Sequence, residues 1–406
     1  MKKLIFELIA VIGGILTIGY LLTEFAPICE KTNCFQWALI LAILVAAVVM
    51  MYRIKYKTYC KPEGTSELKG PLPLNSRYYM ERPPVETECC KTIEQPNALL
   101  CIKSPRQMGK SSLLIRILNK AKKHKNQTVL LSLREANKTM TVNLDKFLLW
   151  FCTIVTQKSG LPTNQITEHW DDTIDGKTNC SKYFQDFLLR ENQSLVLGLD
   201  DVEQIFQSNP SLAQDFFALL QTWHELGVNH TTWRKFKLIL SYSTEVNLFF
   251  NIEQIALFKM GKLIDLTDFS SKQVQQMVRR YRFDWTEPEI QKLTEVLGGH
   301  PYLIRFAFYK IIIKQITLDE LLQNIPIGKG LFYEHLHHYL AVLQDANLLL
   351  IMKQVATAST PIEIDDVAAF KLLNMGLIKF QGNFVIPRCE LYRTYFASQT
   401  LLAKTY

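Results

Sequence analysis

The sequence contains no paired CxxC motif, and its nine cysteines are scattered along the chain rather than spaced as a framework. This pattern excludes a small domain held together by disulfides and is typical of thiols that stay reduced in the cytosol. Cys89 and Cys90 are adjacent, and we interpret them as ordinary core or surface thiols rather than as a redox centre.

A strong excess of charge is also lacking. The formal net charge is +8 for 406 residues, of which 21% are charged and 48% are hydrophobic. A disordered chain would contain fewer apolar residues and more net charge, so we expect a folded chain of two or three domains. Much of the positive charge falls between Lys103 and Lys125, where nucleotide binding and a solvated helix face account for it without nucleic acid.

Two long apolar runs stand near the N-terminus, at residues 4–22 and 37–52. The first is long enough to cross a bilayer core of about 30 Å, and the second is just sufficient. Basic residues flank the pair and are scarce between the runs, which predicts cytoplasmic ends and an outward loop. We therefore expect residues 1–53 to be a transmembrane helical hairpin, a two-helix anchor in a bacterial inner or internal membrane. The second run argues against a cleaved signal peptide.

The outward loop of this hairpin contains Cys29 and Cys34, which are equally consistent with a disulfide and with two free thiols. Residues 54–69 are mostly polar and lack a clear hydrophobic period, so we expect a linker there, with the rest of the chain in the cytoplasm.

The segment from Ser104 to Ser112 has the context of a phosphate-binding loop, because it follows an apolar strand pattern and opens a helical one. In such a loop backbone N–H groups surround the phosphates, Lys110 reaches the β- and γ-phosphate oxygens, and the Ser111 hydroxyl ligates Mg²⁺. Ser104 replaces the first glycine of the usual motif. The predicted nucleotide-binding residues of this phosphate loop are Ser104, Pro105, Arg106, Gln107, Met108, Gly109, Lys110, Ser111 and Ser112.

Farther along the chain, the strand pattern at residues 194–199 ends in the two carboxylates Asp200 and Asp201. A strand that ends in this way supplies what a nucleotide–Mg²⁺ site needs opposite the phosphate loop. We expect Asp200 to hold the Mg²⁺ shell through water and Asp201 to orient the attacking water. Together with Lys110, they are the predicted catalytic residues.

Two further segments supply candidates for nucleotide contacts. Residues 236–245 predict a strand that ends in hydroxyls, and Ser243 or Thr244 is expected at the same sheet edge, near the γ-phosphate. Satisfying a strand-end carbonyl explains these hydroxyls as well. Residues 70–84, the leading segment, precede the phosphate loop. Arg82 or a neighbouring tyrosine of this segment is expected beside the adenine base, and packing of the segment against the core explains these residues equally well.

Taken in order, these stretches resemble the bacterial AAA-like domain family, a branch close to the STAND class of signal-transducing ATPases. The specific blocks are the Pro-Arg-Gln-Met-Gly-Lys-Ser and Gly-Gly-His-Pro-Tyr sequences, and further matches extend the resemblance over nearly everything after residue 70. The matching blocks are residues 70–73, 79–84, 105–111, 199–200, 206, 213–216, 223–225, 243–245, 298–303 and 389–396. The resemblance implies an α/β P-loop NTPase, a parallel sheet flanked by helices, that binds ATP and Mg²⁺ as a nucleotide-operated switch.

The resemblance also implies roles for residues of a helical lid. His300 and Pro301 are expected to lie against the nucleotide, and Arg305 is expected either at the γ-phosphate or on the surface. The family usually has glutamate where this chain has Asp201, which is one methylene shorter. A displacement of roughly 1 Å in a positioning group costs about 10²-fold in rate, so we expect ATP binding with slow or conditional hydrolysis. Ser104 replaces Gly or Ala, which adds only a short hydroxyl side chain.

The domain boundaries that we predict are 70–267 for the ATPase core, 268–330 for the lid and 331–406 for a winged-helix module. Helices are expected at residues 113–118, 144–155, 183–190, 269–281, 286–297, 302–313, 331–352, 365–375 and 389–402, with a strand at 128–133 and a hairpin at 376–387.

The winged-helix module is not expected to bind DNA, because its second helix carries Asp365 and Asp366 and only Lys371. Packing against the ATPase or a partner is preferred. Its cluster of three histidines, His335, His337 and His338, does not point at one centre on a helix, so we expect no metal there.

The sequence as a whole predicts a membrane-anchored ATP-binding switch that acts in signalling or assembly through partners, with a homo-oligomer as one possibility. Two alternatives stay open. One is a membrane-tethered DNA-binding regulator that uses the winged helix, and the other is a scaffold whose nucleotide site has degenerated.

Overall fold

The computed structural model describes residues 70–190, 194–314, 316–323 and 330–399. The predicted membrane hairpin and linker lie outside these residues. Within the described part of the chain, no helix is both long and apolar enough to cross a bilayer. Residues Ser66–Tyr406 form one compact unit.

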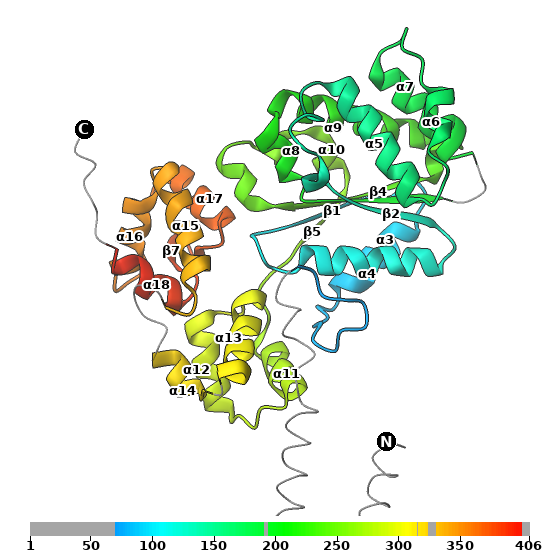
Figure 1. The fold of residues 1–406 in the computed structure, drawn as a ribbon. Helices are drawn as coiled ribbons and strands as arrows, with labels where there is room; N and C mark the ends of the chain where they lie inside the picture. The colour runs from blue at the N-terminus through cyan, green and yellow to red at the C-terminus, as the bar shows by residue number, and fades with distance from the viewer. Residues whose placement is uncertain (1–69, 191–193, 315, 324–329, 400–406) are drawn as a thin grey trace, which may run out of the picture. The chain divides into compact units, whose positions relative to one another are not determined.

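A five-stranded parallel sheet is the centre of the core (Figure 1). The strands are β1 (Leu99–Ser104), β2 (Gln127–Ser132), β3 (Leu195–Asp200), β4 (Phe236–Ser243) and β5 (Lys262–Asp265), in the order β2-β3-β4-β1-β5. Every residue of β3 and β4 is buried, and this explains why the sequences of both strands are largely apolar. The predicted parallel sheet is therefore confirmed, and β5 was not predicted because this short edge strand has one buried residue.

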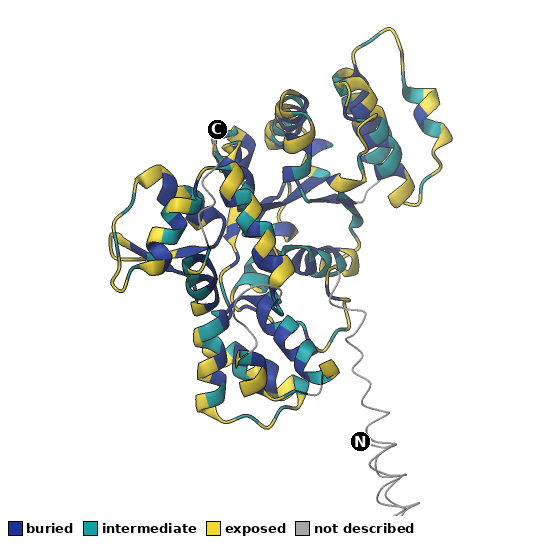
Figure 2. Ribbon diagram, turned by 60° about the vertical axis from the view of Figure 1, so that its left-hand side comes forward, coloured by how far each residue is buried: buried dark blue, intermediate teal, exposed yellow. Residues whose placement is uncertain are grey.

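Helices cover both faces of the sheet (Figure 1). Helices α3 (Val85–Glu94) and α4 (Lys110–Lys123) lie on one face, and α5 (Leu144–Lys158), α8 (Glu203–Ser208), α9 (Pro210–Asn229) and α10 (Ala256–Met260) lie on the other. The side chains of β1 point alternately to the two faces of the sheet. Leu100 and Ile102 belong to the apolar core between the sheet and α4, and Leu99 and Cys101 belong to the core on the other face. The strands are buried while the helices expose their outer faces (Figure 2).

The first helix after the phosphate loop packs closely on the sheet. A Cβ added to Gly198 of β3 would meet the side chains of Leu118 and Leu114 at 2.9 and 3.0 Å. A larger residue at this position would require the two leucine side chains to move, so glycine allows α4 to pack closely on β3.

The chain between α5 and β3 departs from the prediction of a helix at residues 183–190. Helices α6 (Asn164–His169) and α7 (Gly176–Tyr183) come first, and a π-helical turn, η3 (Phe184–Leu188), continues α7. Phe184 lies in the core, where its ring is 5.6 Å from that of Phe151 and 4.5 Å from that of Trp223. The helix therefore begins earlier than predicted and ends in a wider turn. The short 3₁₀ turns of the core are η2 (Leu133–Glu135), η4 (Trp233–Lys235), η5 (Thr244–Leu248) and η6 (Ile252–Gln254).

The segment predicted to be a lid, residues 268–330 and called the lid below, contains four helices among its described residues. They are α11 (Ser271–Tyr281), α12 (Glu287–Leu297), α13 (Pro301–Lys314) and α14 (Leu318–Gln323). Capping boxes start α11 at Ser270 and α12 at Thr286, and Gly298, at φ 63°, ends α12. Pro301 then occupies the first position of α13, which suits its fixed φ angle. The three predicted lid helices are confirmed.

The C-terminal module, residues 331–399 in the structure, has three helices, a hairpin and a last helix. The elements are α15 (Tyr333–Asp345), α16 (Leu349–Thr357), α17 (Asp366–Asn374), β6 (Ile378–Gln381), β7 (Phe384–Pro387) and α18 (Glu390–Ala397). The predicted hairpin is confirmed, and Ile362 adds an isolated bridge to Val385. The single helix predicted at residues 331–352 is wrong, because Asn347 adopts the left-handed conformation at φ 55° and separates α15 from α16.

The lid and the C-terminal module share one apolar core. Leu303 of the lid and Leu336, Leu372 and Phe396 of the module belong to the same buried cluster. The module is therefore packed onto the rest of the unit rather than attached by a linker alone.

Candidate nucleotide site

The phosphate loop joins β1 to α4. Gly109, at φ 97°, is the residue before the first turn of α4, and Gln107 also has a positive φ of 62°. These left-handed residues turn the chain so that the backbone of the loop wraps the N-terminus of the helix, where anions bind. Ser104 is the last residue of β1 and is not in the left-handed region, so the first glycine of the usual motif is not required here.

Lys110 lies inside this loop. Its Nζ donates to the carbonyl oxygens of Ser104 at 3.0 Å and Pro105 at 2.8 Å. Desolvation lowers the pKa of Lys110, and the carboxylates of Glu203, Glu245 and Asp200 oppose this shift. The ammonium group is therefore held inside the loop by carbonyl oxygens, at the place where a phosphate-binding lysine is needed.

Asp200 lies at the carboxyl end of β3, opposite the loop. Its side chain is buried, and the Ser241 hydroxyl of β4 donates to its Oδ1 at 2.7 Å. Asp200 and Ser111 line one cavity. A carboxylate and a hydroxyl are the oxygen ligands that Mg²⁺ prefers, with water and phosphate oxygens completing the shell. The donor set therefore fits the predicted Mg²⁺ site, and no group of three or more His, Cys, Asp or Glu in the described residues offers a separate metal site.

Asp201 is held by the last residue of β2 and by a residue of the turn η2 that follows. The Ser132 hydroxyl donates to its Oδ2 at 2.7 Å, and Arg134 forms an ion pair with its Oδ1 at 3.0 Å. The backbone of Asp201 has a positive φ of 54°, which is uncommon for a residue with a side chain. Both oxygens of the carboxylate that was predicted to orient water are therefore engaged.

Glu203 is a site residue that the sequence reasoning did not select. Its side chain is buried, and its Oε2 accepts a hydrogen bond of 3.0 Å from the backbone N–H of Ser243. Burial raises the pKa of Glu203, and the charge of Lys110 opposes the shift. In the sequence it is only an acid in the first turn of a helix, which is a common position, so its role depends on the packing of α8 against β4.

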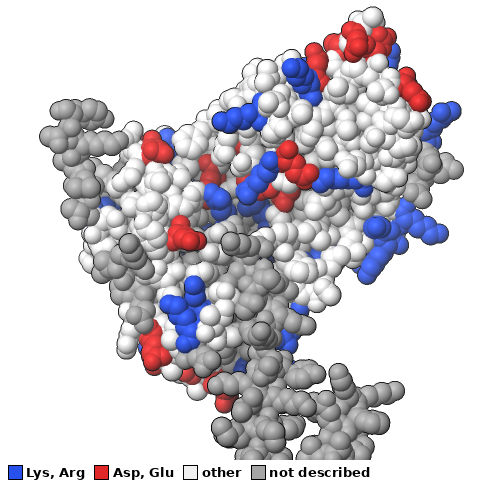
Figure 3. Space-filling model, in the orientation of Figure 1, with Lys and Arg blue, Asp and Glu red and all other residues white. Residues whose placement is uncertain are grey.

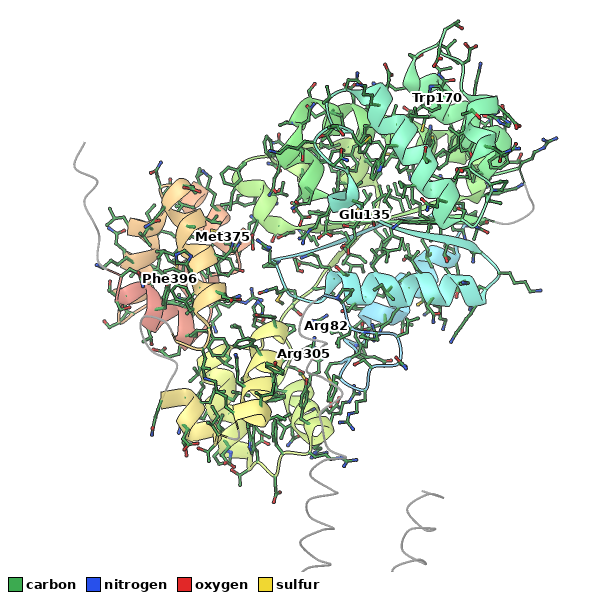
Figure 4. All side chains as sticks on the ribbon, viewed as in Figure 1. Arg82, Glu135, Trp170, Arg305, Met375 and Phe396 are labelled. Carbon is green, nitrogen blue, oxygen red and sulfur yellow. The ribbon has the colours of Figure 1, made fainter. Side chains whose placement is uncertain are left out.

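A cavity of about 540 Å³ joins these groups, a volume suited to a small molecule. Of the predicted residues, it is lined by Arg82, Arg106, Gln107, Met108, Gly109, Lys110, Ser111, Ser112, Asp200, Asp201, Ser243, Pro301 and Arg305. Arg82 and Arg305 are labelled in Figure 4, and Trp170 lies at the far end of the core. The cavity therefore connects the phosphate loop, the two strand ends and the lid.

Four predicted residues do not line this cavity. Ser104 and Pro105 are the first two residues of the loop, and their carbonyl oxygens accept hydrogen bonds from Lys110. The Thr244 hydroxyl donates to the carbonyl of Asn374 at 2.6 Å, so it faces α17 rather than a phosphate. His300 is buried, with its ring centroid 5.5 Å from that of His335. Burial lowers the pKa of His300 well below its usual value, so its ring is neutral.

The leading segment forms one wall of the cavity. Arg82 is buried, its Nη2 donates to the Met108 carbonyl at 2.6 Å, and its guanidinium stacks 4.6 Å from the Phe269 ring. Tyr79 lies under the guanidinium of Arg116 at 3.6 Å. Aromatic and guanidinium planes beside the loop are suitable for stacking a base, and Arg82 also ties the loop to the lid.

The C-terminal module touches the phosphate loop directly. Arg106 and His338 are 2.9 Å apart, and Gln107 and His335 are also 2.9 Å apart. Arg388 pairs with Asp268 of the lid at 2.8 Å and approaches the sulfur of Met108 at 3.6 Å. The contacts between loop and module join residues more than 200 positions apart, so no local sequence signal could have predicted them.

A family model for the AAA-like domain matches residues 67–398. The chain belongs to this family. The AAA-like domain thus includes the core, the lid and the C-terminal module, and the family predicted from the sequence is confirmed. No curated protein matches the chain.

A similar solved structure shows the fold of this AAA-like domain. A Walker-type ATPase of Pyrococcus abyssi is similar over 81% of this chain and 99% of its own, with 15% identity and a TM-score of 0.55. The ORC2 protein of Aeropyrum pernix, in ADPNP–ADP complexes, is similar over 77% of this chain and 93% of its own, with 15% identity and a TM-score of 0.45. At 15% identity the match to the Walker-type ATPase shows the fold alone, which is that of a P-loop NTPase.

Proposed function

We propose that this chain is an ATP-binding switch that is anchored in a membrane, hydrolyses ATP slowly or conditionally, and acts through partners. The observation that carries the proposal is that one cavity joins Lys110, Ser111 and Asp200. A lysine for the phosphates, a hydroxyl and a carboxylate for Mg²⁺ are the groups that a nucleoside triphosphate needs.

The contacts of the loop support a switch. Side chains of Arg106 and Gln107 reach the C-terminal module, and Arg82 reaches the lid. A ligand that changes the position of these side chains changes the stability of both contacts, which is how binding energy shifts a conformational equilibrium. A switch of this kind agrees with the relation to STAND ATPases that the sequence suggests.

Slow hydrolysis follows from the state of Asp201. It is one methylene shorter than the glutamate that the family resemblance led us to expect, and Ser132 and Arg134 hold both of its oxygens. Binding of the nucleotide does not depend on this carboxylate.

Thermal unfolding with and without ATP–Mg²⁺ tests the proposal. ATP–Mg²⁺ at about 100 times its Kd should stabilise the wild type by about 2.7 kcal/mol, and Lys110→Ala should lose most of this effect. A wild type that gains no stability from ATP–Mg²⁺ would favour the alternative of a scaffold with a degenerate site.

The membrane anchor is a proposal that rests on the two apolar runs at residues 4–22 and 37–52. Expression with and without residues 1–53, followed by membrane fractionation and alkaline extraction, tests it. The whole chain should resist extraction, and the shortened chain should leave the membrane fraction. Extraction of the whole chain by alkali would contradict the anchor.

The DNA-binding alternative concerns the winged-helix interpretation of the C-terminal module, which the order of helices, the hairpin and the bridge at Ile362 support. The outer face of α17 exposes Val367, Phe370 and Leu373, at 60%, 42% and 40%. Basic and acidic side chains are interspersed over the face drawn in Figure 3. An apolar helix face suits a protein partner or a second copy better than phosphates, and salt-dependent binding of duplex DNA by the whole chain would contradict this preference.

A further inference from the structure

Two carboxylates face the cavity just after Asp200, and their surroundings differ. Asp201 has its Oδ2 bound by the Ser132 hydroxyl at 2.7 Å and its Oδ1 paired with Arg134 at 3.0 Å. A base that takes a proton from water must have an available lone pair directed at that water. Each oxygen of Asp201 keeps a second lone pair, but the Ser132 hydrogen bond and the positive charge of Arg134 make this carboxylate a weaker proton acceptor.

Glu203 is placed differently. Its Oε2 accepts from the backbone N–H of Ser243, at the end of β4, and its side chain lines the cavity. The hydrogen bond from the main chain fixes this oxygen, and the charge that acts on the carboxylate is that of Lys110. The side chain is 7% exposed, so it is desolvated at the edge of the site.

The charges around Lys110 separate the two acids as well. Of the four carboxylates whose charges act on Lys110, Glu203 acts most strongly and Asp201 least. Because Coulomb interactions weaken with distance and with solvent, Glu203 is the acid more closely coupled to the cation that binds the β- and γ-phosphates. Burial also raises the pKa of Glu203, which makes this carboxylate a stronger base than an exposed one.

We propose that Glu203, rather than Asp201, accepts the proton of the water that attacks the γ-phosphate. The inference rests on the proposed ATP-binding function. The water oxygen forms a bond to the γ-phosphorus while the bond from that phosphorus to the β–γ bridging oxygen breaks. ADP leaves with the electron pair of the broken bond, and the water proton passes to Glu203 and then to solvent. Asp201 keeps Arg134 at the cavity and takes no proton.

Phosphate release by the full-length protein with ATP and Mg²⁺ tests the inference with two matched variants, Glu203→Gln and Asp201→Asn. Each change replaces a carboxylate by an amide of the same shape, and in Glu203→Gln the new amide oxygen still accepts from the N–H of Ser243. Nucleotide binding, measured by calorimetry with a slowly hydrolysed ATP analogue, serves as the control for folding. General bases contribute roughly 10²–10⁴-fold, so Glu203→Gln should lower kcat at least about 10²-fold with Kd changed less than about threefold.

The matched variant and the pH profile complete the test. Asp201→Asn should lower kcat less than Glu203→Gln does, because it weakens the contact with Arg134 but removes no proton acceptor, and Glu203→Asp should be intermediate. The decline of kcat at low pH should be present in the wild type and absent in Glu203→Gln, which a merely structural role would not produce. The opposite pattern, with Asp201→Asn inactive and Glu203→Gln active, would overturn the inference. If the wild type binds ATP but shows no turnover, the inference about Glu203 is overturned and the proposed ATP binding stands. If the wild type does not bind ATP–Mg²⁺, both the inference and the proposed function are overturned.

Discussion

The Nδ1 of His335, on α15, lies 2.9 Å from Oε1 of Gln107 in the phosphate loop. The other ring nitrogen, Nε2, lies 2.9 Å from the hydroxyl of Tyr392 on α18. A neutral imidazole satisfies both partners, because one nitrogen donates to the amide oxygen and the other accepts from the hydroxyl. A buried, neutral histidine therefore connects the loop that binds phosphates to two helices of the C-terminal module.

This histidine makes stability depend on pH. Burial lowers the pKa of His335 well below its usual value, with the neighbouring His300 contributing in the same direction. A lowered pKa in the folded state means that the unfolded chain binds the proton more readily, so stability is lost as the pH falls below about 6.5. Urea unfolding at pH 7 and pH 5 measures how much the free energy of unfolding falls between the two values. We expect this fall to be about 1–2 kcal/mol smaller in His335→Gln than in the wild type.

His338 provides the matched control for this experiment. It lies on the same helix and its side chain is 38% exposed. His338→Gln measures, on the same helix, how much the change from histidine to glutamine alone alters the stability at pH 7. An unchanged pH dependence in His335→Gln would contradict the role of His335.

Arg82 is expected to hold the loop and the lid together. Its guanidinium donates to the Met108 carbonyl and stacks on Phe269, so Arg82→Ala leaves a buried acceptor and removes a cation–π contact. We expect a loss of about 1–3 kcal/mol in urea unfolding and weaker ATP binding. Arg82→Lys should recover only part of both, because lysine lacks the planar fork. Lys91→Ala, on the exposed side of α3, is the surface control, and equal effects of the two alanine variants would argue against the role of Arg82.

Asn347 is expected to define the break between α15 and α16. Its φ of 55° is costly for residues other than glycine, asparagine and aspartate, so Asn347→Ala should cost about 1–2 kcal/mol and Asn347→Gly should be neutral or stabilising. The neighbouring Ala346, at φ −87°, should show the opposite preference, and Ala346→Gly should destabilise by roughly 0.5–1 kcal/mol. Thermal unfolding of the three variants measures these differences. A destabilised Asn347→Gly would indicate a continuous helix.

The parts of the fold that sequence predicted best are those with a strong local signal. The strands β1, β3 and β4 are buried apolar runs, and the loop between β1 and α4 carries its own residue pattern. β5 gave little signal because it has four residues at the sheet edge. The helix break at Asn347 was missed because asparagine is tolerated within a helix, and only the packing of α15 and α16 selects its left-handed conformation.

The same difference applies to the site. Lys110, Ser111 and Asp200 were predicted because strand ends in a parallel sheet meet at one edge, which follows from topology alone. Other contacts of the site depend on how side chains from different elements are placed. Ser132 and Arg134 contact Asp201, and the backbone N–H of Ser243 donates to Glu203. Thr244 was predicted with Ser243, yet the next residue along a strand end points the other way and contacts Asn374.

The central claim is that Lys110 and Asp200 act on one bound ATP–Mg²⁺. Calorimetric titration of ATP into the wild type, Lys110→Ala and Asp200→Asn, each with Mg²⁺ and with a chelator, tests it most directly. We expect Lys110→Ala to weaken binding by about 10–100-fold in either condition, because it removes charge-assisted bonds to phosphate worth about 1.5–3 kcal/mol. Asp200→Asn should weaken binding only when Mg²⁺ is present. Equal affinities in all three proteins, or an Asp200→Asn effect that does not depend on Mg²⁺, would contradict the account.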